Sequence, residues 1–219
     1  MVTFEDIKKC EEIKTYIKHA DESLVALGYT EHSFAHVGKV ATTAGRILET
    51  LGKDPHQVEL AMIAGYMHDI GNLINRVAHS QSSAVMAFRI LDHLKMPAED
   101  VATIVTAIGN HDEGTGVAVN DVAAALIIAD KCDVRRSRVR NTDFSTFDIH
   151  DRVNYSVTDA EVVVSPETGE LILNLEIDTE ISPVMDYFEI FLTRMIMCRK
   201  ASEKLGLVFR LKINNQLMI

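Results

Sequence analysis

The spacing of hydrophobic residues changes once along this chain, near residue 152. Before that point, apolar and small residues recur every three or four positions, as between Val40 and Leu51, which is typical of helices. After it, leucine and isoleucine occupy every second position from Leu171 to Ile177, which is typical of a strand. One segment cannot satisfy both periods. The sequence therefore predicts a mainly α fold, with a helical body over residues 1–152 and a small α+β appendage over residues 153–219.

Helix-starting and helix-ending residues divide the first part into consecutive helices. Asp54 and Pro55 predict a helix start, with Asp54 as N-cap, and Gly71 predicts the end of that helix just after His68-Asp69. The same reasoning predicts an early helical segment between Phe4 and Leu24. Further helices are predicted over residues 31–51, 79–94, 98–111 and 121–136.

The appendage is predicted to hold three strands and one helix. A β-branched run at residues 160–164 and the alternating run at 171–177 flank the turn Pro166-Glu-Thr-Gly169, which indicates a β-hairpin. Ser182-Pro183 is expected to start a long helix that ends near Gly206, followed by a strand at residues 209–213. Its methionine-rich helix is suited either to a homodimer contact or to a small lid over the helical body, and the sequence does not choose between the two.

Composition narrows the range of functions. The chain has 219 residues, is 47% hydrophobic and carries a formal net charge of −10. An acidic surface disfavours binding to extended nucleic acid. The sequence has three cysteines, none in a C-x-x-C pair, and shows neither a signal peptide nor an apolar run long enough to span a bilayer. We therefore expect a cytoplasmic protein without a membrane partner.

Several histidines and aspartates stand where their helices should face inward. Asp130 follows the apolar run Leu126–Ala129, where a carboxylate is costly unless it is paired or binds a metal. The other members of this set are the i, i+4 pair His32 and His36, together with His68, Asp69, His79 and His111. Each alone has a simpler interpretation, such as a structural histidine, or a pair between Asp130 and Lys131 or Arg135. Together they indicate a site for a divalent metal.

Three segments of the chain resemble the HD-domain metal-dependent phosphohydrolases. His36-Val-Gly-Lys-Val-Ala is similar to the family's His-x-x-Arg-Val-Ala, with Lys39 where arginine is usual. Ala64-Gly-Tyr-Met-His-Asp-Ile-Gly is similar to Leu-Leu-His-Asp-Ile-Gly, and Ile128-Ala-Asp-Lys supplies the last aspartate. The resemblance covers roughly residues 30–140 and implies the HD helical bundle. It also implies that one ion is held by His36, His68, Asp69 and Asp130, and it leaves His32 as a supporting or exposed residue.

Some members of this family bind a second ion through histidines on the two following helices. His79 and His111 match those places, with Asp69 as the bridge. The alternative is that both histidines stay without metal and bind the substrate phosphate. The segment after His111 is similar to the loop of the HD-GYP subfamily but has Val117-Ala118 in place of Tyr-Pro, which puts cyclic di-GMP hydrolysis in doubt. One or two ions are expected, of Mn, Fe, Ni, Mg, Co or Zn.

The resemblance implies hydrolysis of a phosphate ester of a nucleotide or another small phosphorylated molecule by metal-activated water. In this scheme Asp69 orients the water and His79 or His111 protonates the leaving oxygen. Lys131 and Arg76 are the first candidates for binding phosphate. Arg135 and Arg138 form either a phosphate clamp or a solvated helix end.

Three other functions remain open at this stage. The first is a phosphodiesterase acting on a cyclic or signalling nucleotide. The second is a non-catalytic regulatory module that binds metal or nucleotide, and the third is oxidation at a di-iron centre.

Overall fold

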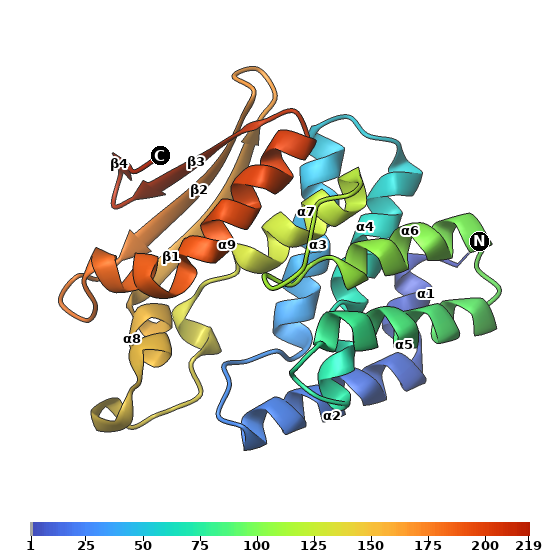
Figure 1. The fold of residues 1–219 in the computed structure, drawn as a ribbon, viewed down its shortest axis with the longest axis horizontal. Helices are drawn as coiled ribbons and strands as arrows, with labels where there is room; N and C mark the ends of the chain where they lie inside the picture. The colour runs from blue at the N-terminus through green and yellow to red at the C-terminus, as the bar shows by residue number, and fades with distance from the viewer. Residues whose placement is uncertain (1) are drawn as a thin grey trace.

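The computed structural model describes residues 2–219, with the helices of the N-terminal part on one side and a sheet near the C-terminus on the other (Figure 1). The helical part contains α1 (Phe4–Lys9), α2 (Glu11–Ala26), α3 (Phe34–Thr50), α4 (Pro55–Met67), α5 (His79–His93), α6 (Ala98–Gly109) and α7 (Asp121–Lys131), and the short 3-10 helix η1 (Ile70–Leu73) follows α4. The predicted helical body with a C-terminal appendage is confirmed.

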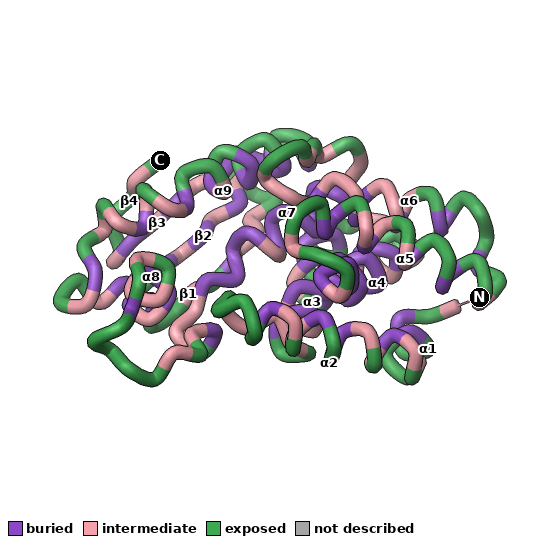
Figure 2. The backbone as a smooth tube through the Cα atoms, turned by 60° about the horizontal axis from the view of Figure 1, so that its bottom comes forward, coloured by how far each residue is buried: buried purple, intermediate pink, exposed green. Residues whose placement is uncertain are grey.

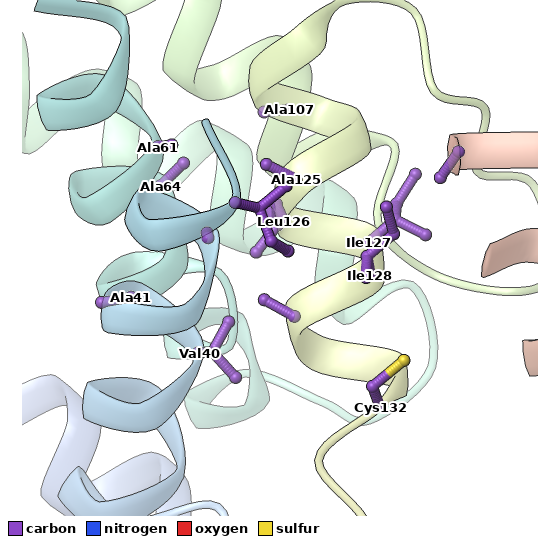
Figure 3. Packing of buried hydrophobic residues seen from close by; sticks show 14 of the residues in the cluster. Val40, Ala41, Ala61, Ala64, Ala107, Ala125, Leu126, Ile127, Ile128 and Cys132 are labelled. Atoms are coloured by element: carbon purple, nitrogen blue, oxygen red, sulfur yellow. The ribbon is translucent and has the colours of Figure 1, made fainter. Parts of the chain in front are cut away.

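Helix α7 lies at the centre of the fold. It packs against α3, α4, α6 and also α9 of the appendage, and it is buried from Val122 to Ala129 (Figure 2). Being covered on all sides explains why its sequence is apolar without a helical period. Small residues such as Ala41, Ala64 and Ala125 line the contacts between α3, α4 and α7 and allow these helices to approach closely (Figure 3).

Gly65 sets the distance between α3 and α4. A Cβ atom at this position would lie 2.7 Å from the Cα of Ala41 on α3, closer than carbon atoms tolerate. Only glycine therefore fits at this crossing without moving a helix. The close crossing helps bring His36, near the start of α3, toward His68 at the end of α4.

The appendage consists of one sheet and the helices around it. Its elements are α8 (Ile149–Ser156), β1 (Val157–Ser165), β2 (Glu170–Ile177), α9 (Val184–Lys204), β3 (Val208–Ile213) and β4 (Gln216–Leu217), with the strands in the order β1-β2-β3-β4. The hairpin β1–β2 is antiparallel, whereas β2 and β3 run parallel because α9 carries the chain across between them. Helix α9 contacts β3 and α7, so it joins the appendage to the helical body (Figure 1).

Four local predictions differ from the structure. The helix predicted over 121–136 ends at Lys131, since Arg138 donates from Nη1 to the carbonyl oxygen of Asp133 and folds this segment into a compact turn instead. The helix predicted from residue 31 begins at Phe34, because the side chain of Ser33 caps it. The early helical segment breaks at Cys10 into α1 and α2, and the appendage gains the two-residue strand β4.

Other start signals are confirmed. Asp54 caps α4 with Pro55 at its first position, and Pro183 directly precedes α9. The predicted division at residues 152/153 falls within α8. Among residues 2–219, no helix combines the length and the apolar character needed to cross a bilayer.

Candidate metal centre

Six predicted side chains come together where several helices end or begin. His36 lies in the first turn of α3, His68 and Asp69 directly follow α4, and Asp130 is the next-to-last residue of α7. His79 starts α5, and His111 follows the end of α6. All four of these histidines are buried, as is Asp69, while Asp130 is slightly more accessible. The helix ends thus carry to one place residues that are far apart in the sequence.

Four of these side chains surround one point. Nε2 of His36 lies 3.4 Å from Oδ1 of Asp130 and 3.7 Å from Oδ2 of Asp69. Nε2 of His68 lies 3.3 Å from the same Asp69 oxygen and 3.7 Å from the same Asp130 oxygen. Two ligands at about 2.1 Å from one ion in tetrahedral or octahedral geometry are about 3.0–3.4 Å apart, so two of these four distances fit a shared cation and the two of 3.7 Å are slightly longer.

The hydrogen bonds of the histidines decide which nitrogen faces this point. Nδ1 of His36 donates to Oδ2 of Asp133 at 2.8 Å, and Nδ1 of His68 donates to the carbonyl oxygen of Gly65 at 2.8 Å. Each ring therefore keeps a proton on Nδ1 and turns Nε2 inward, and Nε2 is the nitrogen through which each could bind a metal.

Those two nitrogens have no hydrogen-bond partner in the protein. Nε2 of His36 and Nε2 of His68 are buried polar atoms without a partner among residues 2–219. A buried acceptor left unpaired costs about 1–3 kcal/mol. A divalent cation placed among the two nitrogens and the two carboxylates would satisfy all of them, and the residues present therefore fit a metal.

The second oxygen of Asp69 faces a different pair of histidines. Its Oδ1 lies 3.4 Å from Nε2 of His79 and 3.9 Å from Nε2 of His111. These two nitrogens are 3.1 Å apart, while Nδ1 of each ring donates to a backbone carbonyl oxygen, of Arg76 and Ile108 respectively. Two lone pairs at that distance repel unless a proton or a cation lies between them. Asp69 therefore stands between two groups that could each hold an ion.

The charges of the cluster shift its pKa values strongly. Burial lowers the pKa of His68, but the negative charges of Asp69 and Asp130 outweigh burial and raise it to about 10. Burial, together with repulsion from His68 and Lys131, lowers the pKa of His111 to about 3. Although burial opposes ionisation, His68 holds the pKa of Asp69 well below its usual range. Without a bound cation, one proton on His68 thus offsets part of the negative charge.

A chain of ion pairs links this centre to the appendage. Nζ of Lys131 lies 2.8 Å from Oδ2 of Asp130 and 3.1 Å from Oε2 of Glu113. The other oxygen of Glu113 accepts a hydrogen bond from Nε of Arg194 on α9 at 2.7 Å. Lys131, predicted to bind phosphate, is thus held between two carboxylates, and it orients the Asp130 oxygen that the histidines do not face.

The predicted arginines lie in different surroundings. Arg76 is half-buried, donates to Oδ1 of Asn72 at 3.3 Å and has a guanidinium nitrogen 4.0 Å from Oδ1 of Asp69. Arg135 pairs with Asp133 and Glu31, and Arg138 is buried with bonds to the backbone of the same two residues. The interpretation of the arginine run as a solvated helix end is wrong for Arg138, because the helix has ended and the side chain is inside.

The motifs alone missed two supporting residues. Asp133 holds His36, and Asn72 donates from Nδ2 to Oδ1 of Asp69 at 2.9 Å. The three-residue spacing from Asp130 to Asp133 and from Asp69 to Asn72 was the available signal. His32, left as supporting or exposed, is partly buried, donates from Nδ1 to Thr30 and has its ring centroid 5.4 Å from that of His36.

One family model and two known proteins are similar to parts of this chain. Residues 33–135 match the HD domain family, a span that includes all six candidate ligands. An uncharacterized protein of Methanocaldococcus jannaschii is 28% identical over 160 residues, which cover 63% of this chain and 61% of that protein. A solved structure is described as a predicted HD superfamily hydrolase from an uncultured Thermotogales bacterium. It aligns with a TM-score of 0.44 and 24% identity, over 57% of this chain and 67% of that chain. Residues 33–135 of this chain are thus similar to the HD domain.

Proposed function

We propose that this protein hydrolyses a phosphate ester of a small molecule, a nucleotide or another phosphorylated metabolite, at a centre of two divalent cations. The observation that carries the proposal is the position of Asp69, whose two carboxylate oxygens face two separate histidine groups. A carboxylate shared in this way is the expected bridge of a two-metal site.

The residues divide into two ligand sets. His36, His68, Asp130 and Oδ2 of Asp69 would hold one ion, and His79, His111 and Oδ1 of Asp69 would hold the other. Divalent cations bound there would lower the pKa of water to near neutrality and neutralise charge on phosphoryl oxygens. Nitrogen and carboxylate ligands suit Mn, Fe, Co, Ni or Zn, and Mg less well.

The remaining polar residues keep these ligands in place. Asn72 donates to Oδ1 of Asp69, and Lys131 donates to Oδ2 of Asp130, so each carboxylate has one fixed orientation. Arg76 is the cation nearest the bridging carboxylate and still partly open to solvent. We assign it to the non-bridging phosphate oxygens, a role for which a planar guanidinium is well suited.

A single-metal version remains the alternative, and the close histidine pair is what favours it. If only the first set holds an ion, Nε2 of His79 and Nε2 of His111, 3.1 Å apart, must share a proton. That proton could then pass to the leaving oxygen of the ester. Counting the bound ions separates the two versions.

Turnover of a substrate panel tests the proposal. Protein loaded in turn with Mn, Co, Ni, Mg or Zn is offered nucleotides, cyclic nucleotides, cyclic dinucleotides and sugar phosphates, and released phosphate is measured. We expect turnover of a phosphate monoester by the wild type and none by Asp69→Ala. The matched control is Asp159→Ala, which removes an exposed carboxylate on β1. Full activity in Asp69→Ala would contradict the mechanism, and a metal-loaded wild type inactive on the whole panel would favour a regulatory module.

A further inference from the structure

A cavity of about 260 Å³ opens beside the metal centre. Its walls come from the loop before α3, from α8, from α9, and from Arg76 and Arg138. Tyr29, His32, Asp151 and Arg194 are among the other lining residues. Of the lining residues, Arg76 alone lies within residues 33–135, the span that matches the HD family. The cavity is therefore built almost entirely by segments that this chain adds to the family domain.

Two lining residues of the cavity also contact the candidate metal centre. Arg76 lies 4.0 Å from the bridging carboxylate of Asp69, and His32 stacks edge-on to the ligand His36. Arg194 enters from α9, with Nε bonded to Glu113 and its guanidinium carbon 4.6 Å from the ring centre of Phe191. Among the contacts of residues 2–219, its hydrogen bond uses Nε alone, which leaves the terminal nitrogens for a ligand.

Two carboxylates of the α8 region also line the cavity. Asp148 caps α8 by accepting from the backbone N–H of Asp151 with Oδ1, and Asp151 accepts from Nδ2 of Asn141 with Oδ2. One oxygen of each carboxylate is left for a further donor. The cavity is thus lined by three arginines, Arg76, Arg138 and Arg194, and by two carboxylates on or next to α8, and Arg76 is the lining cation for which a distance to the bridging carboxylate, 4.0 Å, places it beside the centre.

This polarity fits one kind of molecule. A phosphate group would lie toward the metal centre and the arginines, and its organic part would present hydrogen-bond donors to the carboxylates. Tyr29, Leu27 and Phe191 give that part an apolar wall for the face of a ring. The cavity is somewhat smaller than the roughly 300–1,000 Å³ of pockets that enclose drug-sized ligands, so it suits one small group.

We propose that this cavity, the specificity pocket, binds the organic part of a phosphate monoester that carries hydroxyl or amino groups, with Asp148 and Asp151 accepting hydrogen bonds from them. Nucleoside monophosphates and sugar phosphates share this chemistry. Dinucleotides exceed the pocket. The inference rests on the proposed function for the phosphate end, whereas the binding of the organic part is a property of the pocket itself.

Two measurements test the inference. The first is kcat/KM for nucleoside 5′-monophosphates and hexose phosphates, each divided by kcat/KM for para-nitrophenyl phosphate, whose ring carries no donor. The variants are Asp148→Asn, which keeps a capping residue on α8, Asp151→Ala and the double variant, with Asp159→Asn as the control on β1. The second measurement is saturation-transfer NMR of free nucleosides and free hexoses with chelator-treated protein.

We expect the ratio to fall about tenfold in each single variant, the size of one hydrogen bond to a charged group, and to stay unchanged in the control. Nucleosides or hexoses, whichever is the true source, should bind the wild type and lose binding in the double variant. An unchanged ratio in the double variant, or no binding of either class to the wild type, would overturn the pocket assignment. If the wild type binds nucleosides or hexoses but hydrolyses no ester with metal, the proposed function fails and the pocket assignment stands.

Discussion

Asp133 accepts a hydrogen bond at 2.8 Å from Nδ1 of His36, a residue 97 positions earlier in the chain. The carboxylate is buried, and it also pairs with Lys39 at 3.2 Å and Arg135 at 2.9 Å. These cations keep Asp133 ionised, so the hydrogen bond holds the proton of His36 on Nδ1. Nε2 of His36 then presents its lone pair to the metal centre. Asp133 would thus act on a bound metal through the histidine and without touching it.

Replacing Asp133 should therefore weaken metal binding while leaving every proposed ligand in place. We expect Asp133→Asn to lower the affinity for Mn²⁺ by about 10–100-fold, the usual effect of losing such a support. Isothermal titration of chelator-treated protein measures it, with a thermal melt to confirm folding. Asp159→Asn, on the exposed face of β1, is the matched control. Equal affinities for the wild type and a folded Asp133→Asn would show that the bond to His36 does not support the metal.

The second ligand set should be separable from the first. His79→Ala and His111→Ala each remove one nitrogen near Oδ1 of Asp69 and leave the four atoms of the first set unchanged. We expect the metal content to fall from two ions per chain to about one in each variant. Elemental analysis of protein purified without chelator measures this. Two ions retained in both variants would mean that these histidines are not ligands.

Metal binding should release protons, because the cation displaces one from His68. With a pKa of about 10, His68 is protonated at neutral pH before the ion binds and must lose its proton to become a ligand. Affinity should rise with pH, by about tenfold per unit between pH 7 and 9 if one proton is lost. Titration calorimetry in buffers of different ionisation enthalpy counts the protons. No proton release at pH 7 would show that His68 is already neutral.

Glu113 should stabilise the fold in a pH-dependent way. Burial raises the pKa of its carboxyl, but the charges of Lys131 and Arg194 outweigh this and lower it to about 2 from an ordinary value of 4.5. Because the folded-state pKa is the lower one, the stabilisation is complete above pH 4.5 and is lost as the pH falls from 4.5 toward 2.

We expect Glu113→Gln to lower the free energy of unfolding by about 2–3 kcal/mol at pH 7, since it leaves two cations partly buried without their counter-charge. Urea denaturation at a series of pH values measures the difference between wild type and variant. That difference should shrink below pH 4.5. A gap that is the same at pH 7 and pH 3 would mean that the charge of Glu113 is not its source.

Local signals place the helix ends that carry the candidate ligands, whereas the choice of His36 over His32 and the grouping of His79 and His111 with the others follow from the resemblance to the HD family. Asp54-Pro55 and Gly71 fix the limits of the segment that carries His68-Asp69, and the apolar run of α7 points to Asp130. The β1–β2 hairpin and α9 were predictable for the same reason, since their periods and turn residues are local.

Contacts between distant segments were not predictable from such signals. The arginine run after α7 has a helical composition, yet the bonds of Arg138 to Asp133 and to Glu31, more than a hundred residues away, fold it differently. Likewise, nothing local in α9 shows that Arg194 reaches Glu113, so the link between the appendage and the metal centre appears only in the structure.

Electron paramagnetic resonance of the protein loaded with Mn²⁺ tests the bridging role of Asp69 most directly. Two ions joined by one carboxylate lie about 3.5–4 Å apart in enzymes of this kind, close enough for their spins to couple. The account predicts a spin-coupled signal with two Mn²⁺ per chain in the wild type, and loss of that coupling in Asp69→Ala. An uncoupled signal from a single Mn²⁺ in the fully loaded wild type would contradict it.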